Sequence, residues 1–262
     1  MLVVVGLGNI GIAIAARLAA VGNDVIGVDV AESRRALWIE QTGRPAVADL
    51  SEVDWTSVDR VFVVVRMTDQ AAEVLTWLAE PAAAGGLTCH LITTLETDFA
   101  AGLAGYLRPG LRIIEQPVSG GASGAREGAL TILTAGSISD QDEEFLRTTL
   151  AARIVRFDTY GEPTKAKLLN NVTGAYNARA LAQMLALAQS QGVDVGKFYE
   201  VLLTASGGSW MASGFMDLLD ETLAKDVHLL RDELGGLPAI TLDDDDDLVT
   251  SLGRARALLA DR

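Results

Sequence analysis

The sequence has little of several residue types, and each shortage excludes a class of protein. Its single cysteine, Cys89, excludes an intrachain disulfide and cannot form a zinc cluster on its own. The chain has 21 basic and 35 acidic residues, a net charge of −14. That balance argues against nucleic acid as a partner, because binding to phosphates needs clustered Lys and Arg. We therefore expect a protein of a reducing, cytoplasmic setting that binds no metal.

Long apolar runs are missing as well. No uninterrupted apolar stretch approaches the ~20 residues that a membrane-spanning helix requires. The apolar segment 1–15 lacks the basic n-region of a signal peptide, and glycines interrupt it at a fixed spacing. Apolar residues make up 49 % of the 262 residues and charged ones 21 %, which is a globular composition. We expect a soluble protein of one large or two ordinary domains, without a membrane partner.

In the first half of the chain, short β-branched runs alternate with helical patterns. Runs such as "VFVVV" are apolar on both faces, as strands buried between two layers of helices should be. The predicted strands are Leu2–Val5, Asp24–Asp29, Arg60–Arg66, Leu87–Thr93, Arg112–Glu115, Leu130–Ala135 and Arg153–Phe157. Helical patterns between them include Ile10–Val21, Asp69–Leu78 and Gln141–Leu150. This alternation predicts an α/β domain over residues 1–158, a Rossmann domain with a doubly wound, mostly parallel sheet.

The strand signal stops after about residue 158. A long helix is predicted from Pro163 to Gln191, with the proline in its first turn and Gly192 just past its end. The further predicted helices are Val195–Thr204, Ser209–Leu219, Glu221–Leu234 and Leu248–Ala260. We expect residues 159–262 to form an all-α domain that the long helix joins directly to the first. The acidic run 243–247 is interpreted as a solvated loop, with metal binding as the weaker alternative.

The segment "GLGNIG" at residues 6–11 follows a predicted strand and opens a helix, which is the context of a dinucleotide-binding fingerprint. Gly6 allows the tight turn, Gly8 lets the backbone approach a pyrophosphate, and Gly11 permits close packing of helix on strand. A glycine-rich turn without a nucleotide is the alternative. The fingerprint predicts a cofactor site at Gly6, Leu7, Gly8, Asn9, Ile10 and Gly11.

Asp29 follows the second predicted strand, 18 residues after Gly11. A carboxylate there can accept hydrogen bonds from the adenosine ribose hydroxyls and would repel a 2′-phosphate. This position favours NAD over NADP. Arg34 and Arg35 follow shortly afterwards and could bind a phosphate, so NADP stays open.

Glycines and serines also cluster in "EQPVSGGASGA", residues 115–125. The N–H groups of Gly120 and Gly121, together with the hydroxyl of Ser119, could form a nest for a carboxylate. An ordinary loop is the default explanation of this segment taken alone.

Four segments stand in the order and approximate spacing of the β-hydroxyacid dehydrogenase family, which includes relatives of 3-hydroxyisobutyrate dehydrogenase and is related to 6-phosphogluconate dehydrogenase. They are "GLGNIG", "PVSGGASGA", "KLLNN" at 167–171 and "KD" at 225–226. The sequence resembles this family over nearly its whole length. The resemblance implies an NAD(P)-dependent oxidoreductase that transfers hydride between the nicotinamide and a small β-hydroxy acid or its semialdehyde. It also implies a homodimer or homotetramer.

The resemblance also implies a role for particular residues. Lys167 would be the catalytic lysine, and Asn171 would position the substrate hydroxyl. The substrate carboxylate would be held by Ser119, Gly120 and Gly121. Residues near the cofactor would include Arg66, Thr94 and Lys225.

Helical geometry supports the choice of lysine in "TKAKLLNN". Lys167 and Asn171 are four residues apart and share a helix face, whereas Lys165 is turned away by about 200°. Burial beside a cofactor can bring a lysine pKa toward the ~7–8 range that suits proton transfer. Lys165 is interpreted as solvated.

Two alternative functions stay open at this point. The first is a reductase of imines or of a specialised aldehyde on the same scaffold, which the presence of Lys167 disfavours. The second is a dinucleotide-binding sensor without catalysis. His228 is interpreted as a surface or packing residue. Trp210 is expected in the core, with a place in the substrate pocket as the alternative.

Overall fold

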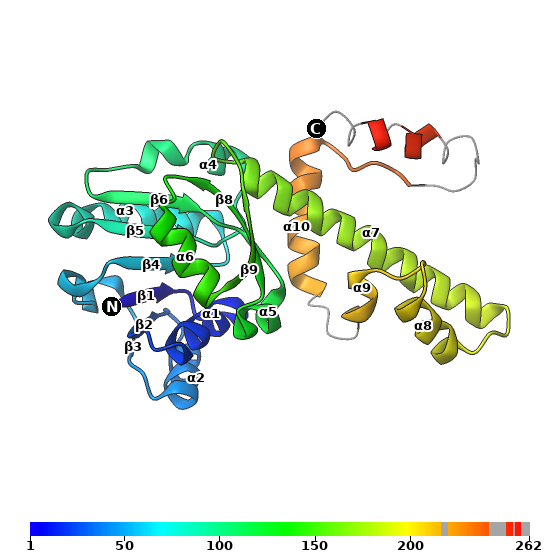
Figure 1. Ribbon diagram of the computed structural model, residues 1–262, viewed down its shortest axis with the longest axis horizontal. Coiled ribbons are helices and arrows are strands. Elements are labelled where there is room, and N and C mark those ends of the chain that lie inside the picture. Colours follow the sequence, from blue (N-terminus) through cyan, green and yellow to red (C-terminus); the bar gives the residue numbers. More distant parts are fainter. Residues whose placement is uncertain (216–219, 241–249, 254, 258–262) are drawn as a thin grey trace.

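The computed structural model describes residues 1–215, 220–240, 250–253 and 255–257. Its first part is a nine-stranded sheet of order β3-β2-β1-β4-β5-β6-β8-β7, with β9 paired to β8 (Figure 1). Strands β1 to β6 are parallel, and β8 is antiparallel to β6. The strands are β1 (Leu2–Val5), β2 (Val25–Val28), β3 (Ala46–Val47), β4 (Arg60–Val63), β5 (Leu87–Leu91), β6 (Leu111–Glu115), β7 (Val118–Ser119), β8 (Leu130–Gly136) and β9 (Ala151–Arg156).

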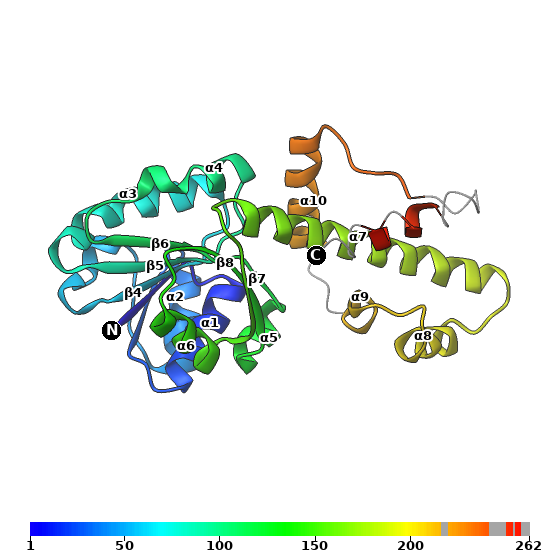
Figure 2. The same cartoon turned by 45° about the horizontal axis from the view of Figure 1, so that its top comes forward.

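Helices cover both faces of this sheet, and the strands show why. In β1, Val3 and Val5 enter one core while Leu2 and Val4 enter the other, so both faces of the strand are apolar. Figure 2 shows α3 and α4 on one face, and α1, α2 and α6 on the other. The helices are α1 (Asn9–Ala20), α2 (Glu32–Thr42), α3 (Thr68–Gly85), α4 (Thr97–Ala101), α5 (Gly121–Glu127) and α6 (Asp140–Thr149). The predicted doubly wound, mostly parallel fold is confirmed.

All seven predicted strands and the three named helices are present, most with ends shifted by one to three residues. The exception is α3, which continues past Pro81 to Gly85, seven residues beyond the predicted end at Leu78. The two-residue strands β3 and β7 were not predicted. The glycine-rich segment after Ser119 is also more ordered than a loop, because α5 begins at Gly121 and packs on α1. Ser119 itself lies in β7, which pairs with β8.

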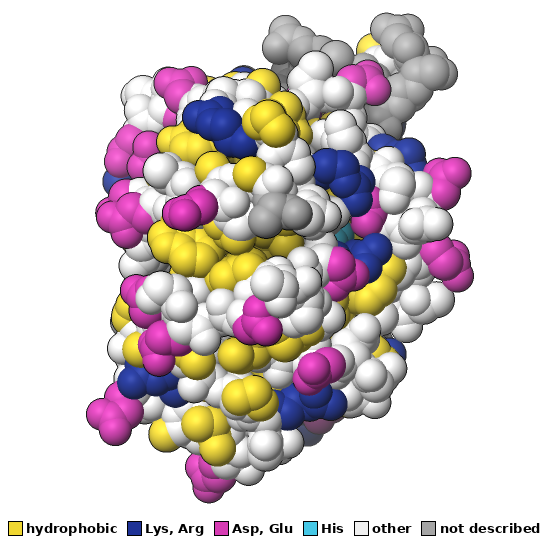
Figure 3. Space-filling view, turned by 90° about the vertical axis from the view of Figure 1, so that its left-hand side faces the viewer, with side chains coloured by type: hydrophobic (Ala, Val, Ile, Leu, Met, Phe, Trp, Pro, Cys, Tyr) yellow, Lys and Arg dark blue, Asp and Glu magenta, His cyan; other side chains and the backbone are white. Residues whose placement is uncertain are grey.

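A buried carboxylate fastens α6 to the sheet. Asp142 is 1 % exposed and accepts hydrogen bonds from Arg112 of β6 at 2.8 Å and Arg60 of β4 at 3.3 Å. Burial alone would raise the pKa of Asp142, but hydrogen bonds from Arg112 and Ser139 hold it well below its usual range. On the face that lies at the left of Figure 1, acidic and basic side chains are interspersed among apolar ones (Figure 3).

The second part of the chain is helical, as predicted. The 29-residue helix α7 (Glu162–Ser190) leaves the sheet domain, α10 (Asp220–Leu234) crosses it, and α8 (Val195–Thr204) and α9 (Trp210–Ser213) lie along its far half (Figure 1). The predicted helix Ser209–Leu219 is wrong in length, because α9 ends at Ser213; residues 216–219 lie outside the described residues. No helix in the described ranges is long and apolar enough to span a bilayer.

The end of the chain bears on two further predictions. Residues 250–253 and 255–257 are helical, within the predicted helix Leu248–Ala260. The acidic run 243–247 lies outside the described residues. Its predicted role therefore stays a prediction.

Candidate active site

The fingerprint loop between β1 and α1 needs glycine at two positions. Gly6 has φ +92°, and a Cβ there would lie 2.6 Å from the carbonyl oxygen of Val64. A Cβ on Gly11 would lie 1.8 Å from the carbonyl oxygen of Gly6. These contacts bring α1 against the turn and against the end of β4, as predicted for this motif.

Gly8 differs from Gly6 and Gly11, because a Cβ on Gly8 would have no atom within 4 Å. Gly8 is the N-cap of α1, no side chain caps this helix end, and the first turn has no acidic residue. The space beside Gly8 is therefore open, and it lies at the positive end of the helix dipole. This opening fits a diphosphate, which is the group that a dinucleotide would place here.

Asp29 organises the same loop. Its carboxylate accepts hydrogen bonds from the Leu7 N–H at 2.7 Å and from the Ala31 N–H at 2.8 Å. Each oxygen has a further lone pair, so the carboxylate can also accept from ribose hydroxyls. The sequence placed Asp29 here but did not reveal that it holds the fingerprint turn.

Two arginines lie beside Asp29. Arg35 donates to the carbonyl oxygens of Asp29 and Val30, and Arg34 approaches the Asn9 amide oxygen at 3.4 Å. Both guanidinium groups thus stand near the place where a 2′-hydroxyl or 2′-phosphate would lie. The loop after β2 thus carries one carboxylate and two cations close together.

The two lysines of α7 have opposite surroundings. Lys165 is exposed, whereas Lys167 is 8 % exposed. Burial lowers the pKa of Lys167, and the charge of Asp226 partly opposes this effect. The predicted contrast between a solvated Lys165 and an enclosed Lys167 is present.

Asn171 connects Lys167 to a buried carboxylate. Lys167 Nζ donates to Asn171 Oδ1 at 2.9 Å, as their i, i+4 spacing predicts. Asn171 Nδ2 in turn donates to Asp226 Oδ2 on α10. Asp226 is 3 % exposed. The carboxylate therefore fixes which way the amide points, with its oxygen toward Lys167. Sequence reasoning quoted the "KD" pair but gave Asp226 no role.

Lys225, the neighbour of Asp226, reaches the carboxyl edge of the sheet. Its Nζ donates to the carbonyl oxygens of Arg66 at 2.8 Å and of Thr94 at 3.3 Å. Burial lowers the pKa of Lys225, and the charge of Asp226 opposes it. Because Arg66 and Thr94 follow β4 and β5, this lysine ties α10 to the edge that carries the fingerprint. The structure thus brings Lys225, Arg66 and Thr94 together.

The segment Ser119–Gly121 follows β6 and reaches the same edge of the domain. Gly120 and Gly121 both have positive φ, +126° and +63°, and a Cβ on Gly121 would meet open space. Among the described residues, no hydrogen bond joins this segment to Lys167 or Asn171. The two groups form separate parts of the candidate site, which a substrate would have to bridge.

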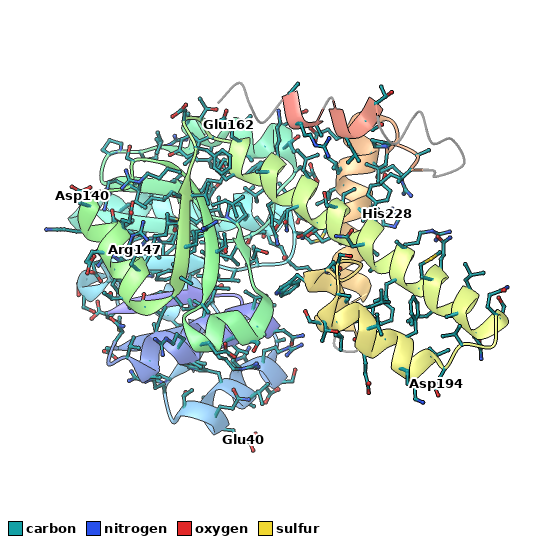
Figure 4. The ribbon with its side chains drawn as sticks, turned by 45° about the vertical axis from the view of Figure 1, so that its right-hand side comes forward. Glu40, Asp140, Arg147, Glu162, Asp194 and His228 are labelled. Carbon is teal, nitrogen blue, oxygen red and sulfur yellow. The ribbon has the colours of Figure 1, made fainter. Side chains whose placement is uncertain are left out.

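Two other candidates from the sequence lie apart from these contacts. His228 is exposed on α10, where its ring contacts Arg231, in agreement with a surface position (Figure 4). Trp210 is 70 % exposed, so the expectation of a core tryptophan is wrong. The reason is local, since Met211 rather than Trp210 packs toward α7, within van der Waals reach of Gly174.

Two family models match the chain. Residues 1–150 match the NAD-binding domain of 6-phosphogluconate dehydrogenase. Residues 161–235 match the NAD-binding domain of NADP-dependent 3-hydroxyisobutyrate dehydrogenase. The chain belongs to the β-hydroxyacid dehydrogenase family. It is thus an NAD(P)-dependent oxidoreductase, and it carries the NAD(P)-binding domains of this family.

Individual β-hydroxyacid dehydrogenases resemble the chain at moderate identity. L-threonate dehydrogenase of Cupriavidus necator is 28 % identical over 214 residues, which cover 79 % of this chain and 71 % of that protein. Two solved structures share the fold. One is described as 3-hydroxyisobutyrate dehydrogenase from Salmonella typhimurium, with 24 % identity, TM-score 0.75 and 90 % and 88 % of the two chains covered. The other is a reductive aminase from Aspergillus terreus, with 19 % identity, TM-score 0.63 and 92 % and 79 % covered.

Proposed function

We propose that this oxidoreductase acts on a small β-hydroxy acid or its semialdehyde and that Lys167 is its general acid and base. The observation that carries the proposal is a chain of two hydrogen bonds, from Lys167 to Asn171 and from Asn171 to Asp226. We call this chain the relay. Lys225, next to Asp226, ties it to the carboxyl edge of the sheet, which also carries the fingerprint. The relatives named for L-threonate and 3-hydroxyisobutyrate support this substrate class.

The relay leaves Lys167 free to move a proton. The Asn171 amide oxygen only accepts hydrogen bonds, so it takes an N–H of Lys167 whether the amine is neutral or charged. When Lys167 is neutral, its lone pair can then accept the proton of a substrate hydroxyl. When it is charged, its remaining N–H groups can protonate a carbonyl oxygen. A bound nicotinamide would accept or supply the hydride. Burial lowers the pKa of Lys167, which favours the neutral form that oxidation needs.

The other predicted site residues would bind and orient. Ser119, Gly120 and Gly121 would hold the substrate carboxylate, because α5 begins at Gly121 and no side chain caps the N–H groups of its first turn. The second N–H of Asn171 Nδ2 would hold the substrate oxygen. Gly6 to Gly11, Asp29, Arg66, Thr94 and Lys225 would surround the cofactor.

NAD is the proposed cofactor. Asp29 supports this choice, because its carboxylate would repel a 2′-phosphate, whereas Arg34 and Arg35 would weaken the preference. We further propose a homodimer located in the cytoplasm. The proposed domains are residues 1–158 and 159–262, which the end of β9 at Arg156 and the start of α7 at Glu162 support.

Lys167→Ala tests the function directly. We expect kcat on small β-hydroxy acids to fall by about 10²–10⁴-fold, the range that general acid–base catalysis supplies, while the Kd of NADH is unchanged. Lys165→Ala is the matched control and should keep wild-type turnover, because Lys165 is exposed. Assays with both NAD and NADP measure the cofactor preference. Full activity in Lys167→Ala would remove the mechanism.

Imine reduction is the second candidate, since the reductive aminase shares the fold. The enclosed lysine favours hydroxyl and carbonyl substrates, because an alcohol proton needs a base and an imine brings its own basic nitrogen. Paired carbonyl and imine substrates, assayed with NADH and NADPH, separate the two. Faster imine reduction would reverse the ranking.

A further inference from the structure

Glu115, the last residue of β6, is a buried acid that lies between the two parts of the candidate site. Its side chain is 0 % exposed. One carboxylate oxygen accepts a hydrogen bond from the Gly161 N–H at 2.7 Å, and the other accepts from the Thr164 N–H at 2.9 Å. Both donors belong to the start of α7. A carboxylate on the sheet thus caps the helix that carries Lys167, from more than 40 residues away in sequence.

The start of α7 depends on this outside cap. Its N-cap residue, Gly161, has φ +91° and no side chain, so it cannot satisfy the free N–H groups of the first turn itself. Among the described residues no cation pairs with Glu115, so the compensating positive charge is the N-terminus of the helix. The acid therefore has a defined partner, and that partner is the helix.

The charged and titratable groups near Glu115 do not cap the start of α7 in its place. Burial raises the pKa of Glu115, and interactions with Thr164 and Gly161 oppose the rise while nearby Glu162 adds to it. The Tyr160 hydroxyl donates to the Ile113 carbonyl oxygen instead. Glu162 is exposed, and its carboxylate accepts from the N–H groups of residues 158 and 159, outside the helix (Figure 4).

The position of Glu115 links the two parts of the site. Thr164 precedes Lys167 by three residues, which is about 4.5 Å along a rigid helix. Ser119 follows Glu115 by four residues. A shift of the first turn of α7 relative to β6 would thus change the separation of Lys167 from the proposed carboxylate nest. Displacements of about 1 Å can cost ~100-fold in rate when they disturb reacting groups.

We propose that Glu115 is a positioning residue, which holds the first turn of α7 against β6 and so sets the distance between Lys167 and the Ser119–Gly121 segment. This inference rests on the proposed function, because it assumes that Lys167 transfers the proton. Glu115 does not touch the reacting atoms in this scheme. It acts through the helix.

Glu115→Gln tests the proposal, with Glu162→Gln as the matched control at the same helix end. The amide keeps the size of the side chain but places an NH₂ donor opposite a backbone N–H. We expect kcat to fall about tenfold to a hundredfold with an unchanged Kd for NADH, and Glu162→Gln to stay within about twofold of wild type. Glu115→Asp, which retains both acceptor oxygens on a shorter stem, should recover part of the loss. It also serves if the Gln variant fails to fold.

Two further measurements separate positioning from stability. Hydrogen exchange of the peptide 161–168 should accelerate in Glu115→Gln while the peptide 6–14 is unchanged, and this readout needs no turnover. In a Lys167→Ala background, Glu115→Gln should cause no additional loss of residual turnover, since residues that act as a unit are not additive.

Three outcomes would overturn the inference. They are wild-type kcat in Glu115→Gln, equal losses of kcat and NADH affinity, or a full additional loss in the Lys167→Ala background. An active Lys167→Ala variant would instead remove the proposed function. The exchange result would then still report whether Glu115 holds the start of α7.

Discussion

The sheet domain and the helical region bury their apolar side chains very differently. The sheet has a core on each face, and both are built from strands and covering helices. The helical region has one small core in the described residues, centred on Leu168, Val172 and Leu230. Helix α8 has no buried residue at all. The sheet domain is thus packed within one chain, whereas the helices beyond it leave apolar surface in solvent.

The two regions also carry different parts of the candidate site. The dinucleotide fingerprint is shaped by close backbone contacts in the densely packed sheet domain, such as Gly11 against Gly6. The proposed proton-transfer residue, Lys167, lies on α7 at the boundary between the two regions, and few but specific polar contacts hold it. Asp226 and Glu115 contribute these contacts from α10 and from β6. The site therefore depends on how a lightly packed region is fastened to a densely packed one.

The largest expected effect tests the sheet domain. Asp142→Asn leaves Arg60 and Arg112 without their shared buried carboxylate, and removing one partner of a buried ion pair costs about 3–5 kcal/mol. We expect a loss near the lower end, because Arg112 is partly exposed. Urea unfolding followed by tryptophan fluorescence measures the change.

The neighbouring Glu143→Gln is the control for that measurement. Glu143 pairs with Arg147 and Arg156 at the surface, where ion pairs contribute about 0–1 kcal/mol. Equal losses in the two variants would contradict the view that Asp142 fastens α6 to the sheet.

A smaller effect, a shift of the pH–rate profile, tests the boundary between the two regions. Burial lowers the pKa of Lys167 and the charge of Asp226 raises it, so Asp226→Asn should lower that pKa further. Oxidation needs the neutral amine, so its rate rises as pH passes the pKa of Lys167. The rising limb should therefore move to lower pH in Asp226→Asn, and the falling limb of reduction should move with it.

Asp232→Asn is the matched control, because Asp232 is an exposed carboxylate on the same helix. Its pH–rate profile for kcat should coincide with that of the wild type. An unmoved or raised limb in Asp226→Asn would show that Asp226 does not influence the proton-transfer group.

Much of the fold was predictable because its signals are local. Strands buried on both faces give continuous apolar runs, so β1, β4 and β5 were found from sequence. Strands β3 and β7 have two residues each, too few for a pattern. Helix α5 forms in a glycine-rich segment that propensity disfavours, and packing on α1 stabilises it.

In the candidate site, too, contacts between residues close in sequence could be predicted, and contacts between distant residues could not. The i, i+4 pair of Lys167 and Asn171 could be predicted, because helix periodicity places both on one face. Asp226 lies 55 residues after Asn171, and Glu115 lies 46 residues before Gly161. No periodicity reports such contacts, since they arise only when α10 and β6 meet α7. Trp210 was misjudged for the same reason, because composition alone does not say which side of a short helix is covered.

The smallest expected change in the free energy of unfolding concerns a substitution in the exposed apolar surface of the helical region. Leu187 on α7 is 50 % exposed, and Met184, three residues earlier, is 46 % exposed on the same face. If a second copy covers this face in the proposed homodimer, Leu187→Ser should shift sedimentation toward the monomer. The free energy of unfolding of one chain should change by no more than about 0.5 kcal/mol, as for other surface substitutions. Ile39→Ser is the matched control, because Ile39 on α2 is 47 % exposed but belongs to the sheet domain. Equal sedimentation of wild type and Leu187→Ser as dimers would place the dimer contact elsewhere, and a monomeric wild type at micromolar concentration would exclude the homodimer.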